Sequence, residues 1–412
     1  MKKIKVRVFS VENLTLGGIV TGIVLGVFLP EGGSVAKILG DIFIRLLKML
    51  IIPLVSVSII SAILTIEKKG ILKQIGFYTI AYYLTTTALA VTTGLILVVV
   101  IHPSVPLRGV THTLSGSATW KDLLLSFFPE NIVKSFAEGK VLQVILFAIL
   151  FSVAVNFLPA KQKGILKDLF QAFNEAFMVI TRWIILLTPA GVFGLVYYIT
   201  SRYGVKSFAE LGWYIVTVVT GLLFHAFVTL PLLGYFLGRF NPYKYSSSVS
   251  EALLIALSTA SSSATLPVSL KVAEEKGKVS PVVAALVLPL GATINMDGTA
   301  LYEAVATVFI ANSYGVSLTA AQLIVVFLTA TLVSIGAAGI QGAGMVMMTI
   351  VLTSVGLPVE GIGLIVVVDR FLDMLRTSVN VWGDLTGAKI ITRFYGGEDD
   401  MASGNVAGEG GG

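Results

Sequence analysis

Charged and amide side chains gather in one short stretch near the C-terminus. The segment "DRFLDMLRTSVNVWGD", residues 369–384, holds three aspartates, two arginines and one asparagine. Its flanks, "GLIVVV" and "VWGDLTGAKII", are apolar like a membrane segment. On a helix each residue turns by about 100°, so seven polar groups share one stripe about 120° wide. These groups are Asp369, Arg370, Asp373, Arg376, Thr377, Asn380 and Asp384.

Both signs of charge in this stripe suit a zwitterionic ligand. A charge inside a membrane costs at least ~2.5 kcal/mol, so such residues usually mark a transport pathway. Arg376 can hold a carboxylate through two parallel hydrogen bonds, and Asp373 can hold an ammonium group. Asn380 and Asp384 suit a small cation. The alternatives are a solvated face of a surface helix and an internal salt-bridge ladder that only joins helices.

A second polar motif, "GATINMDGT", interrupts the apolar segment before it. Gly291, Asn295, Asp297 and Thr299 cannot all share one helical face. The motif therefore favours local unwinding that frees backbone carbonyls, and oxygen-only ligands select hard cations such as Na⁺. The alternative is an ordinary loop turn.

Hydroxyl groups gather at two further places. "SSSATLP", residues 261–267, offers hydroxyls and free N–H groups that suit a carboxylate, although a polar cytoplasmic loop would have the same composition. "AYYLTTTALAV" brings Tyr83, Thr86 and Thr87 together. Threonine in a membrane helix usually bonds its own backbone or a neighbouring helix.

The residues give no support for an enzyme. A catalytic serine among residues 261–263 would need a nearby base, and His225 is the only histidine in an expected span. An aspartic dyad of Asp297 and Asp384 is disfavoured because the asparagine and arginine neighbours suit ion and substrate binding better than a shared proton. Cysteine is absent, which excludes thiolate metal sites.

The composition places these motifs in a lipid bilayer. The 412 residues are 55% hydrophobic and 13% charged, whereas soluble domains are about 25% charged. The net charge of +6 does not indicate nucleic-acid binding, because the basic residues stand at the ends of apolar runs, as topology signals do.

Six membrane spans precede residue 241. A span needs about 20 apolar residues, which fits segments near 12–30, 35–66, 75–101, 141–158, 172–200 and 210–239. Basic residues follow the second, fourth and sixth of them, which indicates cytoplasmic loops there and a cytoplasmic N-terminus. No A-x-A-like cleavage site follows the first apolar run, so we expect it to be retained.

The C-terminal part contains two similar units. Residues 245–314 predict a re-entrant hairpin and then a span interrupted at "NMDGT". Residues 318–393 predict a second hairpin, broken at "SIGAAGIQGAG", and then the span with the polar stripe. Inverted pairs with broken helices near the membrane midplane are typical of secondary transporters. The Gly-rich tail 397–412 is expected to be disordered.

Four motifs in this order, "SSSATLP", "LPLGATINMDGTALYEA", "SIGAAGIQGAG" and "LDMLRTSVNVWGDLTG", resemble the dicarboxylate/amino acid:cation symporter family. The resemblance extends to about Gly396, and inverted repeats are already known for this family. It implies an all-α polytopic membrane protein with eight spans and two re-entrant hairpins, an elevator mechanism and a homotrimer. It also implies a multi-pass plasma-membrane (cell inner membrane) protein with both termini cytoplasmic.

The resemblance divides the chain into scaffold and transport parts. It implies scaffold helices in 1–73 and 109–205, and transport-domain helices in 74–108 and 206–244. The first hairpin and seventh span would occupy 245–314, and the second hairpin and eighth span 315–396, followed by the tail 397–412.

The same motifs imply a site. Arg376 would hold the side-chain carboxylate of aspartate or glutamate and Asp373 its amino group, with the rest of the substrate site from Ser262, Ser263, Thr299, Ile340, Gly344, Thr377 and Asn380. One Na⁺ site would use Gly291, Asn295, Asn380 and Asp384. A second would use carbonyls around Ser334, Ile335 and Ala337 with that of Thr293. A third would use Tyr83, Thr86, Thr87, Asn295 and Asp297.

The sequence also departs from relatives. Archaeal members often carry an arginine where this chain has Ala260, and eukaryotic members carry one where it has Met374; Arg370 stands one turn earlier, as in many bacterial members. Sodium-only archaeal members have glutamine at the position of Glu303. A buried glutamate there can carry a proton, or it can form a fixed ion pair with Arg370.

We therefore expect a sodium-coupled symporter of acidic amino acids, with Na⁺ as the co-transported ion and Glu303 as a candidate for proton coupling. The rival functions are a proton-coupled glutamate or C4-dicarboxylate carrier and a passive anion channel. The intact "NMDGT" and Asp384 favour sodium, and Asp373 favours a substrate with an amino group.

Overall fold

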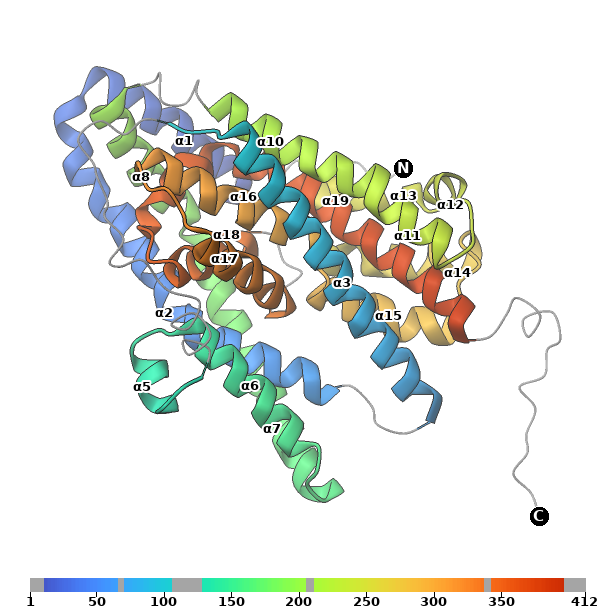
Figure 1. Ribbon diagram of the computed structural model, residues 1–412. Helices are drawn as coiled ribbons and strands as arrows, with labels where there is room; N and C mark the ends of the chain where they lie inside the picture. Colours follow the sequence, from blue (N-terminus) through green and yellow to red (C-terminus); the bar gives the residue numbers. More distant parts are fainter. Residues whose placement is uncertain (1–10, 66–69, 106–127, 205–210, 337–341, 396–412) are drawn as a thin grey trace, which may run out of the picture.

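The computed structural model describes residues 11–65, 70–105, 128–204, 211–336 and 342–395, and all regular elements in these residues are helical (Figure 1). Within these described ranges, five stretches are long and apolar enough to cross a membrane: Pro30–Leu64, Gln74–Ile101, Ala160–Leu186, Leu211–Phe236 and Pro281–Ser313. The expected disordered tail 397–412 lies outside the described residues.

One group of helices comes from the N-terminal half and packs together. It consists of α1 (Val11–Phe28), α2 (Gly33–Thr65), α6 (Val141–Val155), α7 (Ala160–Leu186) and α8 (Thr188–Tyr203), with the one-turn η1 (Pro30–Gly32) before α2 and the short α5 (Ile132–Ala137) beside α6. In Figure 1 the long α2 runs along this side of the molecule, with α6 and α7 at one end.

The expected span near 172–200 is divided in the structure. α7 begins earlier, at Ala160, and ends at Leu186, and α8 continues from Thr188. Pro189 stands in the first turn of α8, where its missing N–H breaks no bond, but its ring would clash with the carbonyl of Ile185 in an uninterrupted helix. The proline therefore explains why one helix became two.

The second group is built around α16 (Asp297–Ser313). It includes α3 (Gly70–Ile101), α10 (Leu211–Phe224), the π-helical turn η2 (His225–Thr229), α11 (Leu230–Phe236) and α12 (Pro242–Ser248). α3 and α10 both pack on α16. Figure 1 shows α3 crossing in front of this group and α10 and α11 running along its upper edge.

Hairpin 1 consists of α13 (Ser250–Thr259) and α14 (Ser262–Glu275). α13 ends where Ala260 adopts a left-handed conformation with φ 47°, and Ser261 caps α14 through its hydroxyl. The far ends of the two helices meet, because Lys276 Nζ lies 2.9 Å from Glu251 Oε2. The helix–turn–helix expected here is therefore present, although Pro267 lies within α14 and does not break it.

The expected interruption at "NMDGT" is confirmed. α15 (Pro281–Ile294) ends before Asn295, and α16 (Asp297–Ser313) begins two residues later. Hairpin 2 follows as α17 (Ala320–Val333), the short η3 (Ser334–Gly336) and α18 (Ala343–Ser354), and α17 packs against α18. The chain ends with the one-turn η4 (Val359–Gly361) and the long α19 (Ile362–Tyr395).

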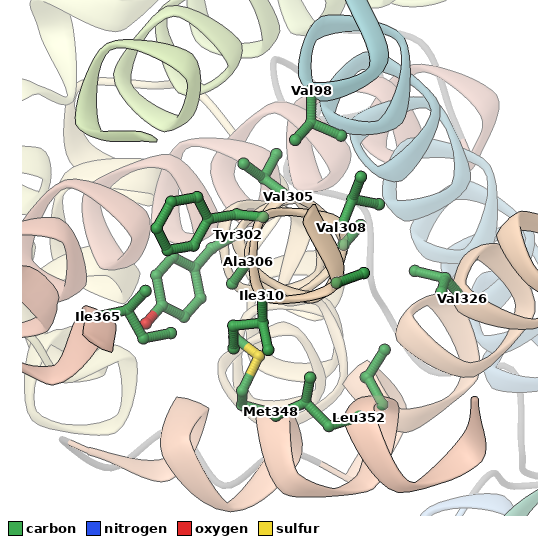
Figure 2. Close-up of a cluster of buried hydrophobic side chains, with 14 of the residues drawn as sticks. Val98, Tyr302, Val305, Ala306, Val308, Ile310, Val326, Met348, Leu352 and Ile365 are labelled. Atoms are coloured by element: carbon green, nitrogen blue, oxygen red, sulfur yellow. The ribbon is translucent and has the colours of Figure 1, made fainter. Parts of the chain in front are cut away.

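The core of the second group lies around α16, where nearly every residue is buried. Figure 2 shows the surrounding side chains: Val98 comes from α3, Val326 from α17, Met348 and Leu352 from α18, and Ile365 from α19. The broken ends of α15 and α16 are thereby fixed beside the middle of α19.

Candidate functional site

The polar stripe of α19 faces the protein interior. Of its seven residues only Arg370 is half-buried, and the other six are at most 8% exposed. Phe371, on another side of the helix, is 57% exposed. The alternative of a solvated helix face is therefore wrong.

Arg376 is fully buried and paired within its own helix. Its Nη2 donates to Asp373 Oδ1 at 2.9 Å and lies 3.0 Å from Asp369 Oδ1. Both carboxylates belong to α19, so these ion pairs connect no second helix. A ladder that only joins helices does not describe this arrangement.

Part of the guanidinium remains available. Nε and Nη1 of Arg376 are buried and have no hydrogen-bond partner among the described residues. The ring of Tyr302 on α16 lies 3.8 Å from the guanidinium carbon, close enough for a cation–π interaction. A buried donor without a partner costs about 1–3 kcal/mol, so a carboxylate arriving here would relieve that cost. We call Asp369, Asp373, Arg376 and Tyr302 the arginine cluster.

Hairpin 2 covers the arginine cluster. The backbone N–H of Gly342 donates to Asp373 Oδ2 at 3.3 Å, just before α18 begins. A Cβ on Gly344 would lie 3.4 Å from Arg376 Nη2, so the first turn of α18 passes directly over the guanidinium. Ile340, which was expected at this tip, lies outside the described residues.

The start of α16 is bound to the next turn of α19. The N–H of Gly298 donates to Asn380 Oδ1 at 2.8 Å, and Asn380 Nδ2 donates to Thr299 Oγ1 at 3.3 Å. A Cβ on Gly298 would come within 2.7 Å of the Arg376 carbonyl oxygen, so only glycine permits this approach. Thr377 is buried in the same region.

Hairpin 1 lies along α19, where Ser378 Oγ donates to Leu253 O at 3.2 Å. Ser262 is buried in the first turn of α14, and Ser263 is exposed. In the described part of the chain, neither serine forms a hydrogen bond to the arginine cluster.

Oxygen atoms from four helices meet deeper in the protein. Asn295 Nδ2 donates to Asp384 Oδ1 at 2.9 Å. A Cβ on Gly291 would lie 2.4 Å from both that oxygen and the Tyr83 hydroxyl, so the glycine gives the carboxylate and the phenol room to approach α15. The tyrosine hydroxyl donates to Val287 O at 2.8 Å.

Asp297 completes this group. Its Oδ1 lies 2.7 Å from Thr87 Oγ1 and 3.2 Å from Thr86 Oγ1. Thr86 Oγ1 is also 3.4 Å from Asn295 Oδ1 and 3.1 Å from Tyr83 O, and one hydroxyl hydrogen serves only one of these acceptors. A cation could be shared by such oxygens. The oxygen cluster comprises Tyr83, Thr86, Thr87, Asn295, Asp297 and Asp384.

The remaining expected carbonyl ligands lie at element ends. Ser334 and Ile335 form part of η3, which packs against α15, and Thr293 stands in the last turn of α15. Carbonyls in such a turn lack a following helical N–H. Ala337 lies outside the described residues.

Glu303 is completely buried on α16, and neither carboxyl oxygen has a hydrogen-bond partner among the described residues. The fixed ion pair with Arg370 is not formed there. The Arg370 Nη1 atom is itself buried without a hydrogen-bond partner in the described part of the chain.

Two residues of the site were not identified from the sequence. Tyr302 stands in the quoted "NMDGTALYEA", three residues after Thr299, which is a helical spacing that could have revealed it. His225 Nε2 lies 3.1 Å from Asp297 Oδ2, and both side chains are fully buried. Only the fold shows this contact, because 72 residues separate the two.

The chain is similar over most of its length to curated excitatory amino acid transporters. The chain is 36% identical over 443 residues to excitatory amino acid transporter 3 of Mus musculus, covering 92% of this chain and 84% of the relative. It is 37% identical over 464 residues to a putative sodium-dependent excitatory amino acid transporter of Caenorhabditis elegans, covering 96% and 92%. Human excitatory amino acid transporter 2 is 36% identical over 450 residues, covering 92% of this chain and 78% of the relative.

A family model described as the sodium:dicarboxylate symporter family matches residues 13–394. The relatives are transporters, which confirms that the chain is not an enzyme, and its apolar helices are those of a membrane protein. The match extends over nearly the whole chain, including both hairpins, the interrupted span and the polar stripe. The protein therefore belongs to the sodium:dicarboxylate symporter family.

Proposed function

We propose that this protein is a sodium-coupled symporter of the acidic amino acids L-aspartate and L-glutamate. The observation that carries the proposal is the buried guanidinium of Arg376, which keeps two unpartnered nitrogen atoms beside Asp373. A carboxylate accepts from a guanidinium through two parallel bonds, and an ammonium group pairs with an aspartate.

In the arginine cluster, a zwitterionic substrate pairs its carboxylate with Arg376 and its ammonium group with Asp373. The substrate's side-chain carboxylate binds Nε and Nη1 of Arg376, and its ammonium group binds Asp373. Thr299, Thr377 and Asn380 supply polar groups one turn further along α19 and at the start of α16. Gly344 of hairpin 2 lies over the guanidinium. The family motifs add Ser262, Ser263 and Ile340 to the proposed substrate site.

The oxygen cluster holds the co-transported Na⁺. One ion takes ligands from Gly291, Asn295, Asn380 and Asp384, and another from Tyr83, Thr86, Thr87, Asn295 and Asp297. A further ion is held by carbonyls of Ser334, Ile335, Ala337 and Thr293. Asn380 belongs to both an ion site and the substrate site, and Asn295 belongs to two ion sites. Ion binding therefore positions polar groups that also receive the substrate.

The transport architecture follows the division of the helices. The chain crosses the membrane eight times, through α1, α2, α3, α6, α7–α8, α10–α11, α15–α16 and α19. Both termini are cytoplasmic, and three copies form a homotrimer in the plasma membrane. Residues 1–73 and 109–205 form the scaffold. The remaining helices carry substrate and ions as an elevator. Support comes from the packing of α1, α2, α6, α7 and α8 on one another.

Uptake into liposomes tests the proposal. Purified protein is reconstituted, and labelled L-aspartate or L-glutamate is offered under an inward sodium gradient and then under a proton gradient without sodium. We expect accumulation above equilibrium with sodium. Equilibration without accumulation would indicate a passive anion channel, and accumulation on a proton gradient alone would indicate a proton-coupled carrier.

Proton coupling through Glu303 is a second candidate function. The observation that favours it is the buried carboxyl without any hydrogen-bond partner among the described residues, because burying an ionised carboxylate without partners costs far more than burying a protonated carboxyl. We expect Glu303→Gln to remove the dependence of sodium-driven uptake on external pH. If the variant keeps the pH dependence of the wild type, Glu303 carries no proton.

A further inference from the structure

His225 contacts the oxygen cluster from a helix that the ion sites do not use. Its Nε2 lies 3.1 Å from Asp297 Oδ2, and both side chains are inaccessible to solvent. The tautomer with its hydrogen on Nε2 donates to this oxygen, because an ionised carboxylate only accepts hydrogen bonds. The bond occupies Oδ2 and leaves Oδ1 directed at Thr86 and Thr87.

The histidine begins a π-helical turn. In η2 the N–H of Leu230 bonds the carbonyl of His225, five residues earlier. The next donor in this register would be residue 231, which is a proline and has no N–H. The turn adds one residue between α10 and α11, and it sets His225 inward while Phe224 beside it is 47% exposed.

Side chains from two other helices satisfy the carbonyls that this turn leaves free. Trp382 Nε1 on α19 donates to Ala226 O at 3.0 Å, and the Tyr243 hydroxyl on α12 donates to Phe227 O at 2.9 Å. Pro231 could have bonded neither carbonyl. The π turn is therefore fixed from α19, the helix that carries Arg376 and Asp384.

We propose that His225 is a positioning residue for sodium: it fixes the Asp297 carboxylate so that Oδ1 points at the ligands contributed by α3. The inference rests on the proposed sodium coupling. Mutating the residue that hydrogen-bonds to a metal ligand commonly lowers metal affinity by about 10–100-fold. The π turn, held by Trp382 and Tyr243, sets the position of the imidazole.

Sodium-induced thermal stabilisation of the purified full-length protein tests this, with choline replacing sodium as the control salt. The variants are His225→Leu, which removes the donor, and His225→Gln, which retains an N–H donor. We expect the leucine variant to need about 10-fold more sodium for half-maximal stabilisation. The glutamine variant should stay within about 3-fold of the wild type.

A purely structural role would give a different result. It would lower the melting temperature in choline equally for both variants and leave the half-saturating sodium concentration unchanged. Wild-type sodium dependence in a folded His225→Leu protein overturns the inference. A wild type that sodium does not stabilise, and that accumulates no substrate, instead overturns the proposed function.

Variants of the supporting side chains decide the matter if His225→Leu does not fold. Trp382→Phe and Tyr243→Phe each remove one hydrogen bond to the π turn and leave His225 in place. Each should raise the half-saturating sodium concentration by about 3-fold, as expected for one lost hydrogen bond. An unchanged sodium concentration in both variants overturns the inference.

Discussion

The arginine cluster and the oxygen cluster each include residues from the polar stripe of α19 but balance their charges differently. In the arginine cluster, Arg376 compensates Asp369 and Asp373 at 3.0 and 2.9 Å within one helix. In the oxygen cluster, Asp297 and Asp384 receive hydrogen bonds from threonine, histidine and asparagine side chains, and no lysine or arginine of the described residues pairs with them.

The difference assigns the two clusters different dependences on ligand. Under the proposed function, Arg376 offsets one of the two negative charges of Asp369 and Asp373 before substrate arrives, and the cluster exchanges partners when substrate binds. Asp297 and Asp384 of the oxygen cluster have no lysine or arginine partner among the described residues, so under the proposed sodium coupling their cations come from solution. Mutations in one cluster should therefore change substrate binding and sodium binding to different degrees.

Loss of the arginine should have the largest effect. Arg376→Ala leaves two buried carboxylates without their cation and should cost on the order of 2–5 kcal/mol in substrate binding, which abolishes accumulation of L-aspartate. Arg376→Lys keeps the charge but lacks the planar fork, so it should recover only part of the uptake. Sodium-induced stabilisation, measured on the same preparations, should persist. Wild-type aspartate affinity in Arg376→Ala would contradict the comparison.

Removing a negative charge from the oxygen cluster should weaken sodium binding more than aspartate binding. Asp384→Asn and Asp297→Asn each remove one anionic ligand and should raise the half-saturating sodium concentration by about 10-fold or more. The half-saturating aspartate concentration, measured at saturating sodium, should change by less than about 3-fold. Equal effects on both concentrations would show that the two clusters behave as one site.

The aromatic ring beside the guanidinium should have a smaller effect. Tyr302→Leu removes the cation–π interaction and should weaken aspartate binding by about 1–2 kcal/mol, whereas Tyr302→Phe retains the ring and serves as the matched control. Uptake as a function of aspartate concentration measures both. Identical losses in the two variants would assign the effect to the hydroxyl group.

A single hydroxyl of the oxygen cluster should have the smallest effect. Thr87 Oγ1 lies 2.7 Å from Asp297 Oδ1, so Thr87→Val should cost about 1 kcal/mol of sodium binding. Thr85, two residues away, is exposed and bonds only its own helix at Ala81 O. Thr85→Val should leave sodium titrations unchanged, and a loss there would point to a general effect on α3.

Much of the candidate site could be predicted from the sequence, because its residues lie on a few short segments with recognisable patterns. The stripe of α19 follows from helical periodicity, and the interruption between Ile294 and Asp297 follows from an asparagine–aspartate–glycine motif inside an apolar run. The break between α7 and α8 was missed, because continuous hydrophobicity masked the effect of Pro189. Tyr302 was missed because an aromatic residue on an apolar helix is ordinarily part of the core.

The sequence alone determined the membrane environment, the two hairpins and the types of polar groups in the candidate site, because composition, periodicity and helix breakers act over a few residues. Only the tertiary structure decided which groups meet. The pairing of Arg376 with Asp373, rather than with another helix, and the contact of His225 with Asp297 depend on helix orientation and on a π turn. The contact of His225 with Asp297 joins residues 72 positions apart, and helix packing brings them within hydrogen-bond distance.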